Sequence, residues 1–285
     1  MPIPLRVSVT NGLPRRDSSD TFRVVDPLDD PVMEDNASIR HARYYGRAAC
    51  LASSVARQWS QRKSTRPGRL GLICNGGPWS LQASWDFVAR AREVGARYVN
   101  PLQFPPTLIS ATGTAAATAA DAHAFAYVVG WDRFAFFDVL HRAGQAVRHH
   151  LADEVLSIAI STSNPAISLA AKRAGLPEPV NVALGFALSE ASENADFWLL
   201  DIGYDESVLA KYPLAQRYDA YYANGSLSFT IPVPLVGGEA YGATAAVLIM
   251  SAMTCHKALQ TPKNRDFALT FREEKHFAFA VFRLG

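Results

Sequence analysis

The sequence lacks the features that most directly reveal a class of protein. Its only three cysteines, Cys50, Cys74 and Cys255, are odd in number and far apart, which favours buried thiols over a disulfide framework or a zinc site. No run reaches the roughly 18 apolar residues that a bilayer span requires. The opening residues, MPIPLRVSVTNG, lack the charged, apolar and cleavage regions of a signal peptide. We therefore expect a cytoplasmic protein that does not enter a membrane.

Charge of either sign is not concentrated in any long segment. The net charge is +2, and the one basic cluster, QRKSTRPGR at residues 61–69, is typical of a solvated loop rather than a nucleic-acid surface. The adjacent His149 and His150 point in different directions on a helix and fit a solvated helix end better than a metal site. The glycines of residues 237–242 lack the accompanying residues of a phosphate-binding loop. Neither nucleic acid, metal nor cofactor is expected.

Apolar patterns predict strands and helices in two successive series. Each series contains strands, a bend with glycine, a long apolar helix and a returning strand, which indicates a layered α/β protein. We expect one compact unit with halves at residues 1–178 and 179–285 and an irregular Tyr- and Asp-rich stretch up to Gly225. The expected helices cover residues 38–59, 80–94, 131–140 and 241–259, with shorter ones within 99–120 and 163–175. The expected strands cover residues 5–9, 69–74, 125–129, 154–161, 180–188, 197–204, 227–231, 267–271 and 276–282.

The most informative absence lies in residues 122–140, AHAFAYVVGWDRFAFFDVL. An apolar strand, Phe125–Val129, meets an amphipathic helix at a bend, and the bend contains no Cys, Ser or Thr. A strand-to-helix bend can expose a nucleophile at the edge of a sheet. The chain therefore lacks a nucleophile where this architecture offers a place for one.

Several segments, in order, resemble the thiolase-like β-ketoacyl synthases. The likeness spans most of the chain from about Ser38 onward, and no single segment is specific by itself. It implies a thiolase-like layered αβαβα fold of two topologically similar halves, shortened in the second half. The segments are RLGLICNGG (69–77), VNPLQFPPTLISA (99–111), ADEVLSIA (152–159), ALGFALSE (183–190), LVGGEAYGATAA (235–246) and the closing HFAFAVFRLG (276–285).

The same resemblance implies that the condensing chemistry has been lost. That chemistry needs a thiolate to hold an acyl group and two histidines to stabilise developing charge. The family's cysteine position falls at Trp131, Arg133 or Phe134, depending on the register. One histidine position is occupied by Glu239, and the segment that should contain the other, residues 207–229, has no histidine. The resemblance thus implies that no residue of this chain is catalytic.

Catalytically silent relatives of the synthases are the chain length factors of type II polyketide pathways, and short members resembling this chain accompany the synthases of aryl polyene pathways. The resemblance implies a heterodimer with an active β-ketoacyl-acyl-carrier-protein synthase, whose acyl tunnel this chain shapes, and contact with the acyl carrier protein through that complex. An exposed edge strand favours such pairing. Expected interface residues are Phe125, Tyr127 and Val129, and expected tunnel-shaping residues are Phe104, Leu108, Trp131, Phe134 and Phe137.

Three alternatives remain open from the sequence. Aromatic residues at helical spacing such as Phe134 and Phe137 are also what a simple core contains. A divergent enzyme that transfers acyl groups or decarboxylates malonyl groups could use Glu239 as a base if burial raised its pKa. A stand-alone acyl-binding homodimer, without a synthase partner, would also fit the composition.

Overall fold

The computed structural model describes residues 5–11, 46–62, 68–130, 132–177, 180–190, 197–223, 226–230, 240–258 and 266–284. Its ten strands are hydrogen-bonded in one continuous order, β3-β2-β4-β5-β1-β6-β10-β9-β7-β8. Strand β1 joins two halves of this sheet: the first half is β3-β2-β4-β5, and the second half is β6-β10-β9-β7-β8. The strands are β1 (Leu5–Asn11), β2 (Leu70–Asn75), β3 (Phe125–Val129), β4 (Glu154–Ser161), β5 (Val182–Ser189), β6 (Phe197–Gly203), β7 (Gln216–Ala223), β8 (Ser226–Phe229), β9 (Asp266–Glu273) and β10 (His276–Leu284).

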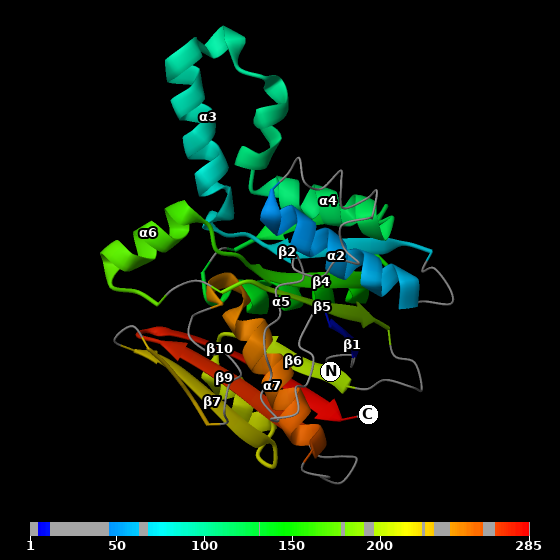
Figure 1. Cartoon of the computed structure of the whole chain (residues 1–285). Coiled ribbons are helices and arrows are strands. Elements are labelled where there is room, and N and C mark those ends of the chain that lie inside the picture. Colours follow the sequence, from blue (N-terminus) through cyan, green and yellow to red (C-terminus); the bar gives the residue numbers. More distant parts are fainter. Residues whose placement is uncertain are drawn as a thin grey trace.

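Helices and the two halves of the sheet alternate in layers (Figure 1). The pair α2 and α4 covers one face of the first half, whereas α5 and α7 lie between the halves. The α-helices are α2 (Arg47–Arg62), α3 (Leu81–Val94), α4 (Ser110–Ala120), α5 (Ala135–Arg148), α6 (Pro165–Ala174) and α7 (Thr244–Ala258). The 3-10 helices are η3 (Pro78–Ser80), η4 (Ala96–Tyr98), η5 (Pro101–Gln103), η6 (Pro105–Thr107), η7 (Glu206–Lys211) and η8 (Tyr241–Ala243).

The first half is buried on both faces, and its sequence reflects this. Every residue of β2 and of β4 is buried, because α2 and α4 cover one face while α5 covers the other. Strands with two covered faces are near-continuous apolar runs, as these are. The strands β3 and β4 both run parallel to β2 and flank it, with α5 as the connection between them. The predicted strand–helix–strand unit is therefore present.

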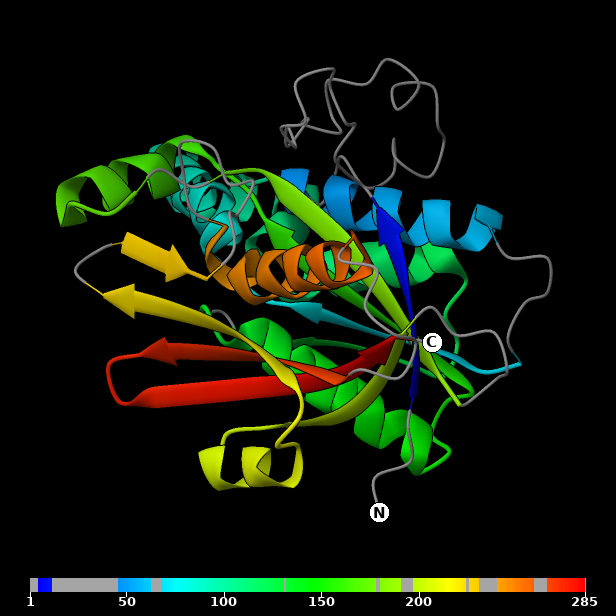
Figure 2. The ribbon, with the colours of Figure 1, turned by 90° about the horizontal axis from the view of Figure 1, so that it is seen from below.

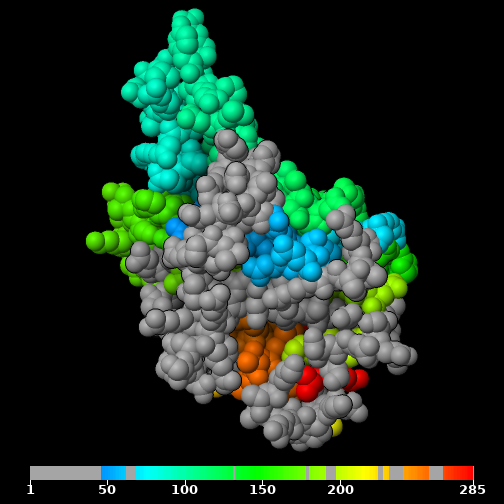
Figure 3. Space-filling model, turned by 45° about the vertical axis from the view of Figure 1, so that its right-hand side comes forward, coloured from blue at the N-terminus to red at the C-terminus, as the bar shows by residue number. Residues whose placement is uncertain are grey.

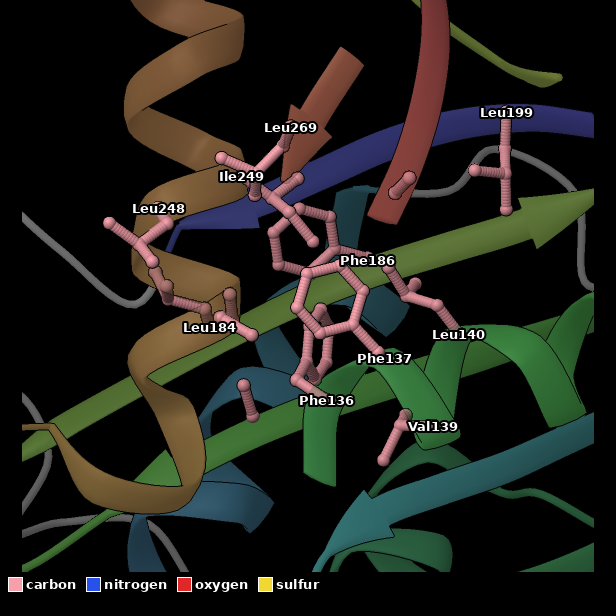
Figure 4. Close-up of a cluster of buried hydrophobic side chains, with 14 of the residues drawn as sticks. Phe136, Phe137, Val139, Leu140, Leu184, Phe186, Leu199, Leu248, Ile249 and Leu269 are labelled. Atoms are coloured by element: carbon pink, nitrogen blue, oxygen red, sulfur yellow. The ribbon is translucent and has the colours of Figure 1, made fainter. Parts of the chain in front are cut away.

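The main hydrophobic core lies between the two halves. The rings of Phe136 and Phe137 on α5 converge with that of Phe186 on β5, and α7 covers the cluster with Leu248 and Ile249 (Figure 4). The apolar face of α5 therefore fixes the spacing between the two halves of the sheet. A second core lies under α2 and α4, where small residues allow the two helices to approach closely.

The second half is covered more sparsely on its outer face. The strand β7, QRYDAYYA, buries Tyr218, Ala220 and Tyr222 and turns Arg217 and Tyr221 outward. Among the described residues, the outer cover is the single 3-10 helix η7, seen in yellow in Figure 2. Outside η7, the described residues Arg217 and Tyr221 of β7 face outward, as expected for a sheet with one solvated face.

The expectation of an irregular stretch before Gly225 is wrong, because this region contains η7 and the eight-residue β7. Its alternation was obscured because the inward positions are Tyr and Ala rather than branched apolar residues. The predicted helix at 38–59 corresponds to α2, although residues 38–45 lie outside the described ranges. No described helix is long and apolar enough to span a bilayer.

An arm formed by residues 81–109 projects away from the layers (Figures 1 and 3). Its long helix, α3, buries no residue. The arm is held together by the rings of Phe87 and Phe104, whose centroids lie 5.8 Å apart. It is anchored to α6 by a hydrogen bond of 3.1 Å from the Ala166 amide to the Gln82 side chain. The arm is therefore an ordered extension that contributes little to the core.

Candidate functional site

The bend after β3 is built by close backbone contacts that only glycine permits. Gly130 has a left-handed φ of 63°, and a Cβ at this position would lie 2.8 Å from the Cβ of Ala135. The amide of Gly76, at the end of β2, donates a hydrogen bond of 2.9 Å to the Gly130 carbonyl. The backbone conformation at residue 130 and the close approach of Ala135 therefore favour glycine at this position.

The first turn of α5 is fixed by Asp132. Its carboxylate accepts a hydrogen bond of 2.8 Å from the Phe134 amide, and its carbonyl accepts one of 3.2 Å from the Ala135 amide. An aspartate in this place satisfies amides that the helix leaves unpaired. Arg133 and Phe134 are consequently held at the mouth of the bend. Trp131 lies outside the described residues.

Arg133 directs its charge into the interior. Its Nη1 lies 2.6 Å from Oε1 of Glu273 at the end of β9, and the two side chains are only 15% and 22% exposed. Its guanidinium carbon lies 3.5 Å from the ring centre of Tyr222 on β7 and 5.7 Å from that of Tyr241 on η8. Both arrangements suit a planar, permanently charged guanidinium. A salt bridge flanked by two tyrosines therefore occupies the bend.

This arrangement offers no acyl acceptor. Arginine stays protonated in proteins and is not a nucleophile. The described residues of the bend, Gly130 and residues 132–135, include no Cys, Ser or Thr. The other candidate for chemistry, Glu239, lies outside the described residues. Burial raises the pKa of the Cys74 thiol well above its usual range, which makes this cysteine unreactive.

The aromatic residues predicted to shape a tunnel fall into two separate groups. Phe134 and Phe137 are buried, and the Phe134 ring packs 4.9 Å from that of Phe271 on β9. Phe104 and Leu108 are exposed on the arm. The structure therefore places one group in the core of this chain and the other on the surface of the arm.

The predicted interface strand is the free edge of the first half. Among the described strands, β3 pairs only with β2, so its other edge is open. Phe125 and Tyr127 stack with their ring centres 4.9 Å apart, and Tyr127 is 55% exposed. The Phe125 ring lies over Gly71 of β2, where any Cβ would meet the ring at 2.4 Å. Val129 is half-buried at the end of the strand.

The open edge and the arm form one surface, which we call the arm–edge surface. A Cβ added at Gly76 would lie 3.2 Å from Ile109 of the arm and 3.4 Å from Val128 of β3, so the base of the arm adjoins the strand. Large apolar side chains are exposed along the arm, and exposed apolar patches of this kind mark interaction sites. They are Leu81, Trp85, Val88, Tyr98, Leu102, Phe104, Leu108 and Ile109.

The sequence did not reveal the partners of Arg133. One of the three possible registers placed Arg133 at the family's cysteine position, but Glu273 is 140 residues away in the chain. Tyr222 and Tyr241 come from two further elements. No local pattern brings these residues together, and the one available signal was an arginine in an otherwise apolar and aromatic segment.

Taken together, the alternating layers, the central α5 and the glycine bend define the fold of the thiolase-like ketosynthases. No protein-family model matches the chain, and no curated protein matches it in sequence. Solved structures do match it, over most of its length.

Three of these structures contain a ketosynthase complex. The ishigamide ketosynthase/chain length factor matches with a TM-score of 0.68 and 15% identity, over 85% of this chain and 81% of that one. AntDE:AntF, a type II polyketide synthase acyl-carrier protein in complex with its ketosynthase, matches with a TM-score of 0.63 and 12% identity, over 86% of this chain and 85% of that one. The ketosynthase ApeO in complex with its chain length factor ApeC, from Xenorhabdus doucetiae, matches with a TM-score of 0.52 and 11% identity, over 86% of this chain and 80% of that one. The predicted thiolase-like fold is thereby confirmed.

Proposed function

We propose that this chain is a non-catalytic ketosynthase-like subunit, a chain length factor, that forms a heterodimer with an active ketosynthase and shapes its acyl tunnel. The observation that carries the proposal is the arm–edge surface, where an unpaired strand adjoins an apolar arm. The salt bridge supports the non-catalytic part, because a paired charge occupies the bend and no described residue there is a nucleophile.

An edge strand exposed to water invites pairing with another chain. The five residues of β3 are apolar or aromatic, FAYVV, and carry none of the charges that natural edge strands use to prevent such pairing. A partner strand would cover the exposed Tyr127 and add main-chain hydrogen bonds. We therefore infer that Phe125, Tyr127 and Val129 lie at the interface with the synthase.

The arm supplies the side chains that would reach the partner. Phe104 is 49% exposed, and Leu108, four residues further along the arm, is also exposed, so both could contact another chain without disturbing the core of this one. Bulk placed at the end of an acyl tunnel removes volume that a longer product needs. We infer that Phe104 and Leu108 limit product length. Phe134 and Phe137 instead stabilise the core, where they hold α5 in place.

The pathway context follows from the same proposal. Among the similar structures, three contain a ketosynthase together with a chain length factor or an acyl-carrier protein. We infer that the heterodimer receives its substrates from an acyl carrier protein in a polyketide or polyene pathway, and that it works in the cytoplasm. No described residue favours a decarboxylase or acyltransferase activity of this chain itself.

The partner claim is tested by co-expression with a full-length ketosynthase that retains its cysteine and is encoded beside this chain. We expect a one-to-one complex by size-exclusion chromatography with light scattering. Tyr127→Asp would place an unpaired charge inside the interface and should weaken association at least about tenfold, or about 1.4 kcal/mol. Leu214→Asp is the matched control, since Leu214 is 91% exposed beyond η7 and should not matter.

Elution of this chain as a stable homodimer in the presence of the synthase would contradict the heterodimer and favour the stand-alone alternative. If the complex forms, Phe104→Ala and Leu108→Ala should shift its products to longer chains, with Leu214→Ala as the control. An unchanged product distribution would contradict the tunnel-shaping role alone. Carbon dioxide release from a malonyl carrier protein by the pure chain would instead support an enzyme.

A further inference from the structure

The arm meets the body of the protein at the N-terminus of α6. This helix lies beside the base of α3 (Figure 1). It begins with Asn164 as its N-cap and Pro165 in its first turn. Because proline has no amide hydrogen, Ala166 and Ile167 are the first residues of α6 with an amide to satisfy. No carbonyl within the helix can accept a hydrogen bond from either one.

These two amides are satisfied from different parts of the chain. The Ile167 amide donates a hydrogen bond of 2.9 Å to the side-chain oxygen of Asn164, as in an ordinary N-cap. The Ala166 amide instead donates one of 3.1 Å to the side-chain oxygen of Gln82 on α3. The amide group of Asn164 in turn donates one of 3.2 Å to the carbonyl of Trp79, just before the arm. The N-terminus of α6 is therefore capped in part by the arm. We call the contacts of Gln82 and Asn164 the arm junction.

The α6 side of the arm junction is fixed to the body of the protein. The Asn181 side chain, just before β5, accepts hydrogen bonds of 3.0 and 2.9 Å from the Thr162 hydroxyl and the Ser163 amide, which lead into α6. Beyond the other end of the helix, the Pro177 carbonyl accepts a bond of 2.8 Å from the Tyr241 hydroxyl. Because α6 is held on both sides, its N-terminus gives the arm a fixed point of reference.

Buried side chains do little to fix the direction of the arm. The helix α3 buries no residue, and neither do η5 and η6. Apolar contact is also not directional, whereas hydrogen bonds are. The connection to α4 fixes where the arm returns to the body, and the arm junction fixes where α3 leaves it. A small change of angle at the junction therefore displaces the far part of the arm by a larger distance.

We infer that Gln82 and Asn164 are positioning residues, which set the direction of the arm and thereby the length of the product. The inference rests on the proposed function, since it requires an arm that shapes a tunnel. Phe104 and Leu108 supply the bulk, and the arm junction determines how far this bulk reaches. A loosened junction allows several positions of the arm, so products of several lengths replace a narrow distribution.

Three variants separate the parts of the arm junction. Gln82→Met removes the acceptor for the Ala166 amide and keeps a side chain of similar length. Gln82→Glu keeps an acceptor and places its charge at a helix N-terminus, where anions are stabilised. Asn164→Asp still caps Ile167 but has no donor for the Trp79 carbonyl. Gln82 and Asn164 are only half-buried, so we expect all three variants to fold.

Hydrogen exchange of the isolated chain, followed by mass spectrometry, tests the arm junction without a partner. In Gln82→Met the peptide that contains Ala166 should lose protection, with exchange of this amide at least about fivefold faster. Gln82→Glu should keep the original rate. Gln145→Met is the matched control, since Gln145 bonds His141 at 2.9 Å within α5. Unchanged exchange in a folded Gln82→Met protein would overturn the inference.

The products of the complex with the synthase test the consequence for chain length. Gln82→Met and Asn164→Asp should broaden the distribution, whereas Gln82→Glu and Gln145→Met should leave it as narrow as in the unaltered complex. Equal broadening by Gln82→Glu and Gln82→Met would overturn the inference, because the acceptor at residue 82 would then not matter. Equal broadening by Gln145→Met would overturn it as well, because the effect would not be specific to the arm.

Phe104→Ala in the same assay distinguishes a failure of this inference from a failure of the proposed function. If Phe104→Ala lengthens the products but neither Gln82→Met nor Asn164→Asp changes them, the inference is wrong and the proposed function stands. If Phe104→Ala also has no effect, the tunnel-shaping role fails and the inference fails with it. Both also fail if the unaltered chain forms no complex with the synthase.

Discussion

Truncation of Phe137 to alanine tests whether the aromatic residues of the core differ from those exposed on the arm. Phe137 is fully buried, at 0% exposure, and its ring faces Phe136 and Phe186 between the halves of the sheet (Figure 4). Removal of the ring leaves a cavity with packed walls on all sides. Phe104 provides the same chemical change on the arm, where half of the side chain already faces water.

The expected magnitude follows from burial. Phe→Ala at a fully packed site lowers the free energy of unfolding by about 3–5 kcal/mol. A chain of 285 residues has an unfolding entropy of about 0.6 kcal/mol per kelvin, so Tm should fall by about 5–8 °C. Phe104→Ala loses mainly its contact with Phe87 and should cost at most about 1 kcal/mol.

Thermal melts followed by circular dichroism, together with urea titrations, compare the two variants directly. We expect Phe137→Ala to lower the free energy of unfolding without any specific change in product length. We expect Phe104→Ala to change product length with little loss of stability. A loss below about 1 kcal/mol for Phe137→Ala, or equal losses in both variants, would refute the assignment of Phe137 to the core. The buried residue Phe137 and the exposed residue Phe104 would then not differ in their contribution to stability as their burial indicates.

Two further predictions concern the junctions between elements. In Gly242→Ala the new Cβ would lie 2.4 Å from Nδ2 of Asn75, whose amide group is held by two hydrogen bonds to Ile160. We expect the free energy of unfolding, measured in urea, to fall by about 1–3 kcal/mol. An unchanged unfolding midpoint would contradict the close contact. Burial, followed by the nearby Cys255, raises the pKa of Tyr218 to about 12. Because the folded-state pKa lies above the ordinary value, the contribution of Tyr218 to the free energy of unfolding is complete below about pH 10. It is lost as the pH rises towards 12, by roughly 2–3 kcal/mol. Tyr218→Phe should therefore flatten the alkaline decline in Tm, and an equally steep decline would show that other groups cause it.

The sequence predicted the elements that have a single, uninterrupted pattern between turn residues. The strands 125–129 and 154–161 match β3 and β4 residue for residue, because an apolar run between turn residues has one simple interpretation. The helix at 80–94 matches α3 within one residue. The strand β7 escaped detection because its inward Tyr and Ala residues resemble a polar, irregular stretch.

The position of β1 could not be read from the sequence. Its alternation predicted a strand, yet not that it would lie between β5 and β6 and join the two halves. Pairing across more than a hundred residues leaves no local pattern, since the partners of β1 lie far from it in the chain. The same reason hid the contact between Arg133 and Glu273.

The Arg133–Glu273 pair also limits what a single substitution at the bend could introduce. Arg133→Cys would add a thiol but leave Glu273 largely buried and without its cation, and breaking a buried pair in this way costs about 3–5 kcal/mol. The neighbouring carboxylate would raise the pKa of that thiol and so suppress the thiolate. A reactive thiol at this position would therefore require changes on α5 and β9 together. The residue type at position 133 is constrained by its partner on β9 as much as by the bend itself.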